Sequence, residues 1–305
     1  LYHAYRSLNN GDNPPSALIK ATVLNTADEL GNPGPDYKHG WGRINARRAY
    51  KLLEQNQYMV DSVSQAGVNT HSIAVPAGIP ELRVMVYWHD YEATAGATKA
   101  LVNNLDMTIT DPAAQVIFPW VLNRTPTVTA LNANAVQGVD TLNNVEQVTI
   151  PSPVAGTYTV NISGFSVPQG PQKYYVVYEF VPDELVLTYP SGGESLVPGV
   201  TETIRWDAYG TTGTFKLEYS IDNGNNWSTI ANNIAGNLRD YNWAPSSAVT
   251  GKGLIRVTRG TITDQWDATF PVLGVPVGLT VTWVCFDSLK INYNAVTGAS
   301  GYVVS

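Results

Sequence analysis

The chain has 305 residues, of which only 14% are charged, and its formal net charge is −7. This acidic balance argues against a nucleic-acid-binding protein, which needs a basic face, and no apolar run reaches the roughly 18 residues of a membrane helix. The length allows two to four domains, and the 17 tyrosines and eight tryptophans beside few charges favour extracellular β-domains over cytosolic helical enzymes.

Three short helical patterns occupy the first 57 residues. Residues 1–8 predict the last turns of a helix, residues 16–27 a second helix launched by Pro14-Pro15, and a third helix follows a glycine-flanked turn with Asn45 as its N-cap. The second helix carries an apolar stripe at helical spacing. Helices this short are not stable alone, so the stripe packs either on the neighbouring domain or on another copy. We expect the second outcome, self-association through residues 1–55.

The stretch from Glu81 to Phe180 predicts one antiparallel β-sandwich of about 100 residues. Its segments are rich in Val, Ile, Thr and Tyr and are bounded by Gly, Pro and Asn. From 104 to 109, Leu105, Met107 and Ile109 alternate with polar residues, which places one row in a core. The same alternation points the apolar residues of 82–88 inward, ending with a buried Trp88.

Four sequence blocks follow one another in this stretch: LVNNLDM at 101–107, NNVE at 143–146, GTYTV at 156–160 and VPQGPQ at 167–172. In this order they resemble the jelly-roll domain that follows the catalytic domain in one branch of the subtilisin-like serine proteases. Two positions depart from the family pattern, because Asn104 replaces the usual aspartate and Met107 the usual leucine.

Residues 15–27 and 40–46 resemble the last two elements of the catalytic domain in the same family. They are a helix that opens with proline and ends in Thr-Ala, and a Gly-x-Gly-x-Ile-Asn-Ala turn. The resemblance implies that the parent protein hydrolyses peptide bonds through an Asp/His/Ser triad upstream of residue 1. The chain holds no G-x-S-x-x-x-P motif, so His39 and the other histidines have no nucleophile to serve. We therefore assign no catalytic residue, and protein or peptide substrates would be bound through the parent enzyme.

One polar cluster is a candidate metal site, formed by Asn104, Asp106, Asn144 and Glu146. Within each pair the spacing of two places both side chains on one face of a strand. Pairing of the two strands would gather two carboxylates and two amide oxygens, which are ligands that Ca²⁺ prefers, and the resemblance also implies calcium here. The alternative is a hydrogen-bonded polar network at strand ends, without a metal.

The remaining residues predict two further β-domains. Seven short, evenly spaced strands between 185 and 272 predict an immunoglobulin-like sandwich, with a structural Asp-box hairpin at 220–227. Residues 275–305 resemble the first strands of a fibronectin type III domain, and Cys285, the only cysteine, is expected to be a buried structural thiol. The predicted domains are thus 1–57, 58–182, 183–273 and 274–305.

The predicted fold class is mainly β: tandem antiparallel sandwiches (jelly roll, Ig-like and partial fibronectin-like) after a short helical remnant of an α/β catalytic domain. The predicted function is a non-catalytic C-terminal fragment of a secreted or cell-surface bacterial subtilisin-like endopeptidase. Its accessory domains would brace the enzyme or position it on substrate, cell surface or polysaccharide, an analogy of domain order only. The alternative is a non-enzymatic adhesion or carbohydrate-binding protein, which would have no use for the helices at 15–55.

Overall fold

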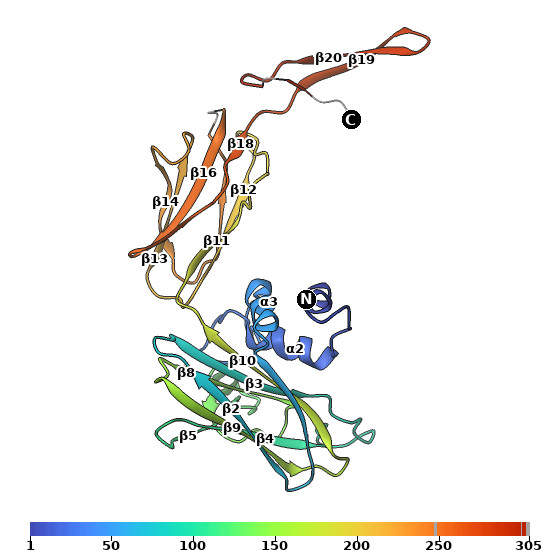
Figure 1. The fold of residues 1–305 in the computed structure, drawn as a ribbon, viewed down its shortest axis with the longest axis vertical. Helices are drawn as coiled ribbons and strands as arrows, with labels where there is room; N and C mark the ends of the chain where they lie inside the picture. The colour runs from blue at the N-terminus through green and yellow to red at the C-terminus, as the bar shows by residue number, and fades with distance from the viewer. Residues whose placement is uncertain (247–248, 300, 303–305) are drawn as a thin grey trace. The chain divides into compact units, whose positions relative to one another are not determined.

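The computed structural model describes residues 1–246, 249–299 and 301–302, and the chain divides into two compact units, Leu1–Pro182 and Asp183–Ser305. Both units are built of antiparallel sheets, and among the described residues helices occur in the first unit alone (Figure 1). The predicted fold class, tandem β-sandwiches preceded by short helices, is confirmed. The finer division into four domains stays a prediction. No helix among the described residues has the length and apolar character needed to span a bilayer.

The sandwich of the first unit consists of two four-stranded sheets. One has the order β1-β10-β3-β8 and the other the order β2-β9-β4-β5. Eight strands in two packed sheets are the jelly-roll arrangement. The strands are β1 Tyr58–Val63, β2 Val68–Val75, β3 Glu81–Trp88, β4 Asn104–Thr110, β5 Val116–Ile117, β8 Val145–Pro151, β9 Gly156–Ser166 and β10 Gln172–Val181.

The core between these sheets follows the predicted alternation. Leu105, Met107 and Ile109 of β4 are buried in it, as are Trp88 and the other inward residues of β3. The Trp88 indole Nε1 donates to the carbonyl of Asn103 at 3.0 Å, so its one polar atom is satisfied inside the core. Burial of this side chain contributes roughly 2–3 kcal/mol at the usual area coefficient.

Three helices cover the outer face of the β10/β3 sheet (Figure 1): α1 Tyr2–Leu8, α2 Ser16–Asn25 and α3 Ala46–Glu54. Asn45 caps α3 as predicted, its side chain accepting the backbone N–H of Arg48 at 3.0 Å. Leu18 of α2 and Leu52 of α3 are buried against Met85 and its neighbours on the sheet. The expectation that a second copy of the chain is needed to cover this stripe is therefore wrong. The jelly roll presents a second apolar face of its own, which the pattern of β3 alone did not reveal.

The long connection between β4 and β8 contains short elements that lie outside the two main sheets. They are β6 Trp120–Val121, which pairs with β7 Val136–Gln137, and the one-turn helix α4 Val128–Leu131. The indole Nε1 of Trp120 donates to the Thr149 hydroxyl of β8 at 2.9 Å, which fixes this region to the sheet.

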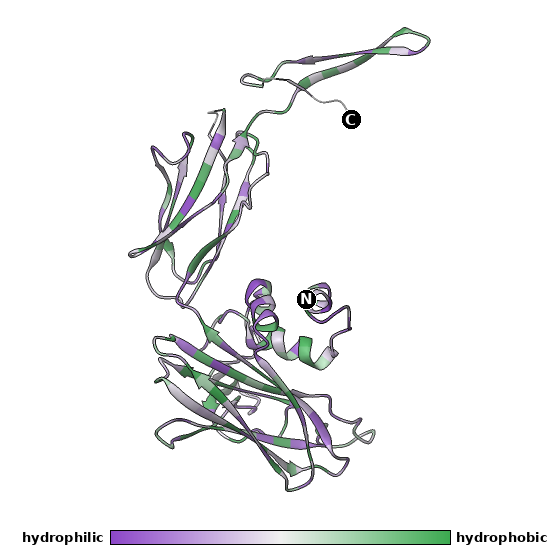
Figure 2. Cartoon of the chain, viewed as in Figure 1, coloured by the Kyte–Doolittle hydropathy of each residue, from purple (hydrophilic) through white to green (hydrophobic). Residues whose placement is uncertain are grey.

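The second unit contains the seven predicted immunoglobulin-like strands and one more, β17, which the sequence analysis missed. They form two sheets, β11-β12-β15 and β14-β13-β16-β17, with β18 also paired to β16. Figure 2 shows hydrophobic and hydrophilic residues alternating along β16. The strands are β11 Leu185–Tyr189, β12 Glu202–Ala208, β13 Thr214–Ser220, β14 Ser228–Ala235, β15 Asp240–Trp243, β16 Thr250–Arg259, β17 Ile262–Gln265 and β18 Phe270–Val272.

The Asp-box hairpin has the local bonding that its sequence predicts. Asp222 Oδ1 accepts the Ser220 hydroxyl at 2.7 Å and the backbone N–H of Asn226 at 2.9 Å. These bonds to the ionised carboxylate lower the pKa of Asp222 to about 2, led by those from Asn226. Trp227 lies beneath the Arg256 guanidinium, whose carbon is 4.2 Å from the ring centroid.

The last strands, β19 Val277–Cys285 and β20 Ser288–Asn294, form a two-stranded hairpin. Its side chains are largely exposed, including Trp283 and Phe286. Cys285 is exposed as well, which corrects the expected buried thiol, because no core among the described residues covers this hairpin. Residues 300 and 303–305 of the predicted fibronectin-like segment lie outside the described residues.

Candidate functional site

Three of the four residues of the predicted metal site lie on two strands that do not pair with each other, and Asn144 directly precedes the second of these strands. Asn104 and Asp106 belong to β4, whereas Glu146 belongs to β8 in the opposite sheet. The amide Nδ2 of Asn104 donates to Asp106 Oδ1 at 3.2 Å, so this pair is brought together. Asn144 is engaged elsewhere, because its Nδ2 donates to the Trp88 carbonyl at 2.6 Å. The expected pairing of β4 with β8 is wrong. The two strands belong to different sheets, and their edges approach each other at Glu146 and Met107.

Glu146 joins the edges of the two sheets. Its side chain reaches β4, where Oε2 accepts the backbone N–H of Met107 at 2.7 Å. Strand β5 pairs only with Ile109 and Thr110 of β4, so the amide of Met107 lies beyond this pairing and takes the carboxyl instead. Burying a carboxyl in this position costs free energy unless it is hydrogen-bonded or protonated.

The environment of Glu146 favours its neutral form. Only 1% of the residue is exposed, and burial raises its pKa well above the ordinary value, with the charges of Asp106 and Asp140 adding to the effect of burial. The Met107 amide acts in the opposite direction, because it stabilises the anion. Burial is the larger effect, so in the absence of a bound cation the environment favours the protonated form of Glu146.

Asp140 is a member of this cluster that the sequence analysis missed. It is buried, its Oδ1 accepts the backbone N–H of Leu142 at 2.8 Å, and its Oδ2 accepts the Asn143 side chain at 2.6 Å. Its charge also contributes to a raised pKa of Asp106, whose main cause is burial. Aspartate side chains often accept the backbone N–H two residues further on and so form a turn. The aspartate in the irregular segment before NNVE was therefore a signal available in the sequence.

Two buried oxygens in this cluster have no hydrogen-bond partner: Asn104 Oδ1 and Glu146 Oε1. Such oxygens can be satisfied by a hard cation or by a proton on the carboxyl. Calcium takes six to eight oxygen ligands, usually with several carboxylates. Among residues 1–246, 249–299 and 301–302, no three His, Cys, Asp or Glu side chains lie close enough together to hold a metal. The residues thus fit a protonated polar network better than calcium, and the calcium site stays a prediction.

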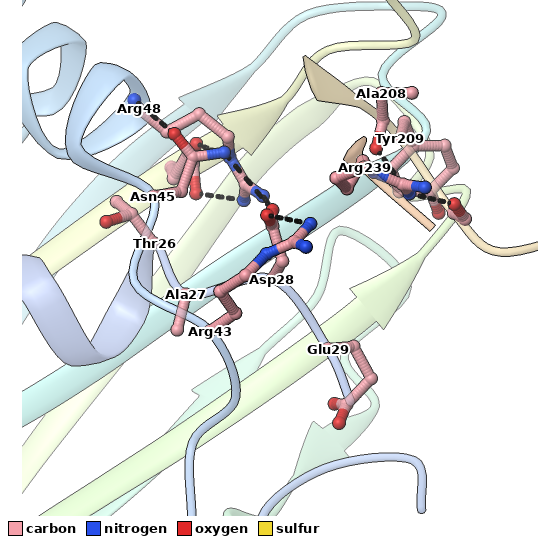
Figure 3. A network of polar contacts seen from close by, with 12 residues as sticks. Thr26, Ala27, Asp28, Glu29, Arg43, Asn45, Arg48, Ala208, Tyr209 and Arg239 are labelled. Atoms are coloured by element: carbon pink, nitrogen blue, oxygen red, sulfur yellow. Dashed lines mark hydrogen bonds and ion pairs between the residues drawn. The ribbon is translucent and has the colours of Figure 1, made fainter. Parts of the chain in front are cut away.

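A second polar feature, which the sequence analysis did not single out, is a buried charged joint between α3 and β10; Figure 3 shows the polar network around Arg48 and Asp28. Arg48 donates Nε to Glu179 Oε1 and Nη2 to Glu179 Oε2, both at 2.6 Å. Its remaining Nη1 donates to Asp28 Oδ1 at 3.1 Å, and Asp28 also accepts Asn45 Nδ2 at 3.2 Å. The side chains of Arg48 and Glu179 are 8% and 7% exposed.

This charged joint is reinforced by two further contacts. Arg43 donates Nη2 to Asp28 Oδ2 at 3.3 Å, and the backbones of Asp28 and Arg43 exchange both of their hydrogen bonds at 2.7 and 2.9 Å. The loop 28–43 is therefore held by hydrogen bonds against the N-terminal end of α3. Because the apolar faces of α2 and α3 also pack on the sheet, the helices and the jelly roll form one body.

Comparison with known proteins finds weak similarity to proteins described as serine proteases fused to transporters. No protein-family model matches the chain. The chain is 26% identical over 177 residues to the serine protease/ABC transporter B family protein tagA of Dictyostelium discoideum, which covers 55% of this chain and 10% of that protein. It is 30% identical over 105 residues to tagD and 35% identical over 99 residues to tagB, proteins of the same description and organism. These matches cover 33% and 32% of this chain, and 6% and 5% of those proteins.

The chain thus spans a tenth or less of the length of these curated relatives. Solved structures resemble it only weakly. A lipase of Bacillus licheniformis in propeptide form has a TM-score of 0.24 at 9% identity, covering 68% of this chain and 40% of that one. The fibronectin(III)-like modules of Clostridium thermocellum CbhA have a TM-score of 0.21 at 13% identity, covering 70% and 94%. Likenesses at this level carry no argument on function.

Proposed function

We propose that the chain is a non-catalytic part of a secreted bacterial subtilisin-like serine endopeptidase, in which the jelly roll braces the last helices of the catalytic domain. The observation that carries the proposal is the joint between Arg48 and Glu179, together with the apolar packing beneath it. The Dictyostelium relatives, which are described as a serine protease combined with a transporter, support an origin in a serine protease.

A brace at this point has a chemical purpose. A serine protease needs its nucleophile within hydrogen-bond reach of a histidine base and an oxyanion hole. A misplacement of about 1 Å in such a site can reduce the rate on the order of a hundredfold. Helices α2 and α3 resemble the elements that follow the nucleophile in this family. Fixing them to a rigid sandwich would hold the region behind the nucleophile in place, while the chemistry itself takes place elsewhere in the parent protein.

The proposal is tested on the natural protein that carries this chain. A fluorophosphonate probe, which labels activated serines, should label that protein, and the labelled band should yield peptides from residues 1–182. Arg48→Met should shorten the half-life of activity at elevated temperature. Lys51→Ala, which removes an exposed ion pair with Glu54 and a contact with the Tyr50 ring, should leave it unchanged.

The 305-residue chain alone should hydrolyse neither casein nor a fluorogenic peptide above background. Hydrolysis by this chain that a serine-directed inhibitor abolishes would contradict its non-catalytic role. Failure of the natural protein to react with the fluorophosphonate probe would contradict its origin in a serine protease.

A further inference from the structure

The first unit contains a cavity of about 140 Å³ over the outer face of the β3/β8 edge. Its floor is formed by side chains of β3 and β8, and its walls by the loop 29–41 and by β6. Since one water molecule needs roughly 10–15 Å³ of such space, the cavity can hold more than a single water. It is separate from the cluster around Glu146, whose side chain faces β4.

Two indole side chains, Trp41 and Trp120, line this cavity. Trp120 is held in one orientation, because its Nε1 donates to Thr149 Oγ1 at 2.9 Å and Gly34 lies directly against its ring. A Cβ built on Gly34 would come within 3.1 Å of Trp120 Cδ2, and the φ of +74° at this position also favours glycine. Both tryptophans are only partly buried, so each retains apolar ring surface toward the cavity or the solvent.

The polar groups of the cavity offer both donors and acceptors. Arg83 donates Nε to Glu81 and Nη1 to the carbonyl of Ala27 at 2.6 Å. Gln147 is buried, and its Nε2 donates to Asn25 Oδ1 at 3.0 Å, which fixes the amide plane. Glu29 accepts the backbone N–H of Leu30 at 3.0 Å and that of Gly34 at 2.9 Å. These side chains are therefore held in place before any ligand arrives.

The charges of this cavity nearly cancel. Arg83 and Glu81 form an ion pair. Burial raises the pKa of Glu29 to about 7, against the opposing charge of Arg83, so that this carboxyl is only partly ionised at neutral pH. Figure 3 shows its carboxyl pointing away from the Asp28 network. The cavity consequently offers no strong net attraction for either a cation or an anion, and favours a neutral ligand.

A ligand for this cavity needs apolar faces for the indoles and several hydroxyl groups that both donate and accept. A pyranose ring has this combination, because its C–H face packs on an aromatic ring and its hydroxyls pair with guanidinium, amide and carboxyl groups. We propose that the cavity lined by Trp41 and Trp120 binds one neutral pyranose residue of a polysaccharide. This inference does not depend on the serine protease origin of the chain, and would give the brace a second role in substrate or surface attachment.

The proposal is tested by saturation-transfer NMR on the 305-residue chain with D-glucose, D-galactose, D-mannose and N-acetyl-D-glucosamine as probes. At least one of these sugars should bind with Kd on the order of 1 mM. Trp120→Ala and Trp41→Ala should each weaken that binding tenfold or more. Trp120→Phe, which keeps an aromatic ring but loses the bond to Thr149, should weaken it less than Trp120→Ala.

Trp227→Ala is the matched control, because this tryptophan lies in the second unit and should leave sugar binding unchanged. Thermal melting of each variant identifies any that fails to fold. If an alanine variant fails to fold, the sugar affinity of Trp120→Phe and Trp41→Phe tests the proposal instead. Absence of saturation transfer from all four sugars would overturn the proposal. Binding that survives the loss of both indoles would also overturn it, as would binding of choline or acetate in place of the sugars.

Discussion

Arg48 and Glu179 form a two-pronged ion pair across 131 residues of sequence, with Nε–Oε1 and Nη2–Oε2 distances of 2.6 Å. The planar guanidinium matches the two carboxylate oxygens, which is the strongest arrangement available to this pair of side chains. Its third contact, to Asp28, connects the loop before α3 to the same point. The pair therefore anchors the helices to the sandwich at a buried position, where loss of one partner leaves a charge uncompensated.

The first prediction concerns this pair. Arg48→Met leaves Glu179 buried without its partner and should cost about 3–5 kcal/mol, as is usual when one member of a buried pair is removed. The loss should appear in hydrogen exchange as reduced protection of α3 and β10, while the second unit is unaffected. Lys51→Ala is the control, because Lys51 and Glu54 are 48% and 36% exposed, and it should cost about 1 kcal/mol or less.

The double variant Arg48→Met with Glu179→Leu separates the charge effect from the packing effect. Because it removes both charges, it should recover part or all of the protection lost in Arg48→Met. If Arg48→Met alone leaves the exchange of α3 unchanged, the ion pair does not anchor the helices, and the apolar packing alone holds them.

The second prediction concerns the pH dependence of stability. Glu146 has a raised pKa in the folded state, so the folded chain binds more protons than the unfolded chain once the pH exceeds the ordinary value of about 4.5. The stability that Glu146 contributes is complete below that value and is lost as the pH rises through the folded pKa. Each pH unit in this window lowers the free energy of unfolding by about 1.4 kcal/mol.

Glu29 has the same sign, but its contribution levels off near its folded pKa of about 7. Melting of the first unit measured from about pH 5 to about pH 9 should therefore show a decline of stability with rising pH that is smaller in Glu146→Gln. The glutamine keeps the shape of the neutral acid and carries no titratable proton. A decline of the same slope in Glu146→Gln would show that another group is responsible, with Asp106 as the next candidate.

The third prediction decides between calcium and a proton at this cluster. If Glu146 is protonated without a metal, millimolar Ca²⁺ should leave the melting temperature of the first unit unchanged relative to a chelator. A calcium ion bound only to the folded state would instead stabilise it, by about 2.7 kcal/mol at a hundredfold excess over Kd. A rise that is lost in both Glu146→Gln and Asp106→Asn would establish the calcium site that the sequence predicted.

The positions of the main strands along the chain were predictable from the sequence, because the pattern of apolar and polar residues in each strand is local. The alternation around Leu105 and Met107 places the core row correctly, and Asn45 is a correct N-cap. Both signals are local, within a few residues of the feature that they predict. The Asp box is likewise set by neighbours of Asp222 alone.

The candidate site was less predictable because it depends on how distant strands meet. The spacing of Asn144 and Glu146 predicts one face of a strand, although Asn144 precedes β8 in the structure. The spacing does not show that β8 borders β3 and only meets β4 across a sheet edge. The partnership of Arg48 with Glu179 has no local signal either, since both look like ordinary surface charges in the sequence. Met85 and Tyr87 alternate along β3 with the residues that face the sandwich core, so the sequence pattern predicts that they are exposed. They are buried because the helices cover the other face of the strand, which only the structure shows.

The last prediction concerns self-association. The stripe on α2 and α3 is covered by Met85, Tyr87 and Val177 within the chain, so removing the helices uncovers these residues. Deletion of residues 1–57 should therefore increase self-association in light scattering, the opposite of what an exposed stripe would give. The measurement is best made with Trp283→Ser and Phe286→Ser in both the 305-residue chain and the chain that lacks residues 1–57, because the exposed hairpin residues would otherwise contribute to association.

With these two substitutions the 305-residue chain should be monomeric at micromolar concentration, with α2 protected in hydrogen exchange. A dimer that dissociates when residues 1–57 are deleted would show that the helices also bind a second copy.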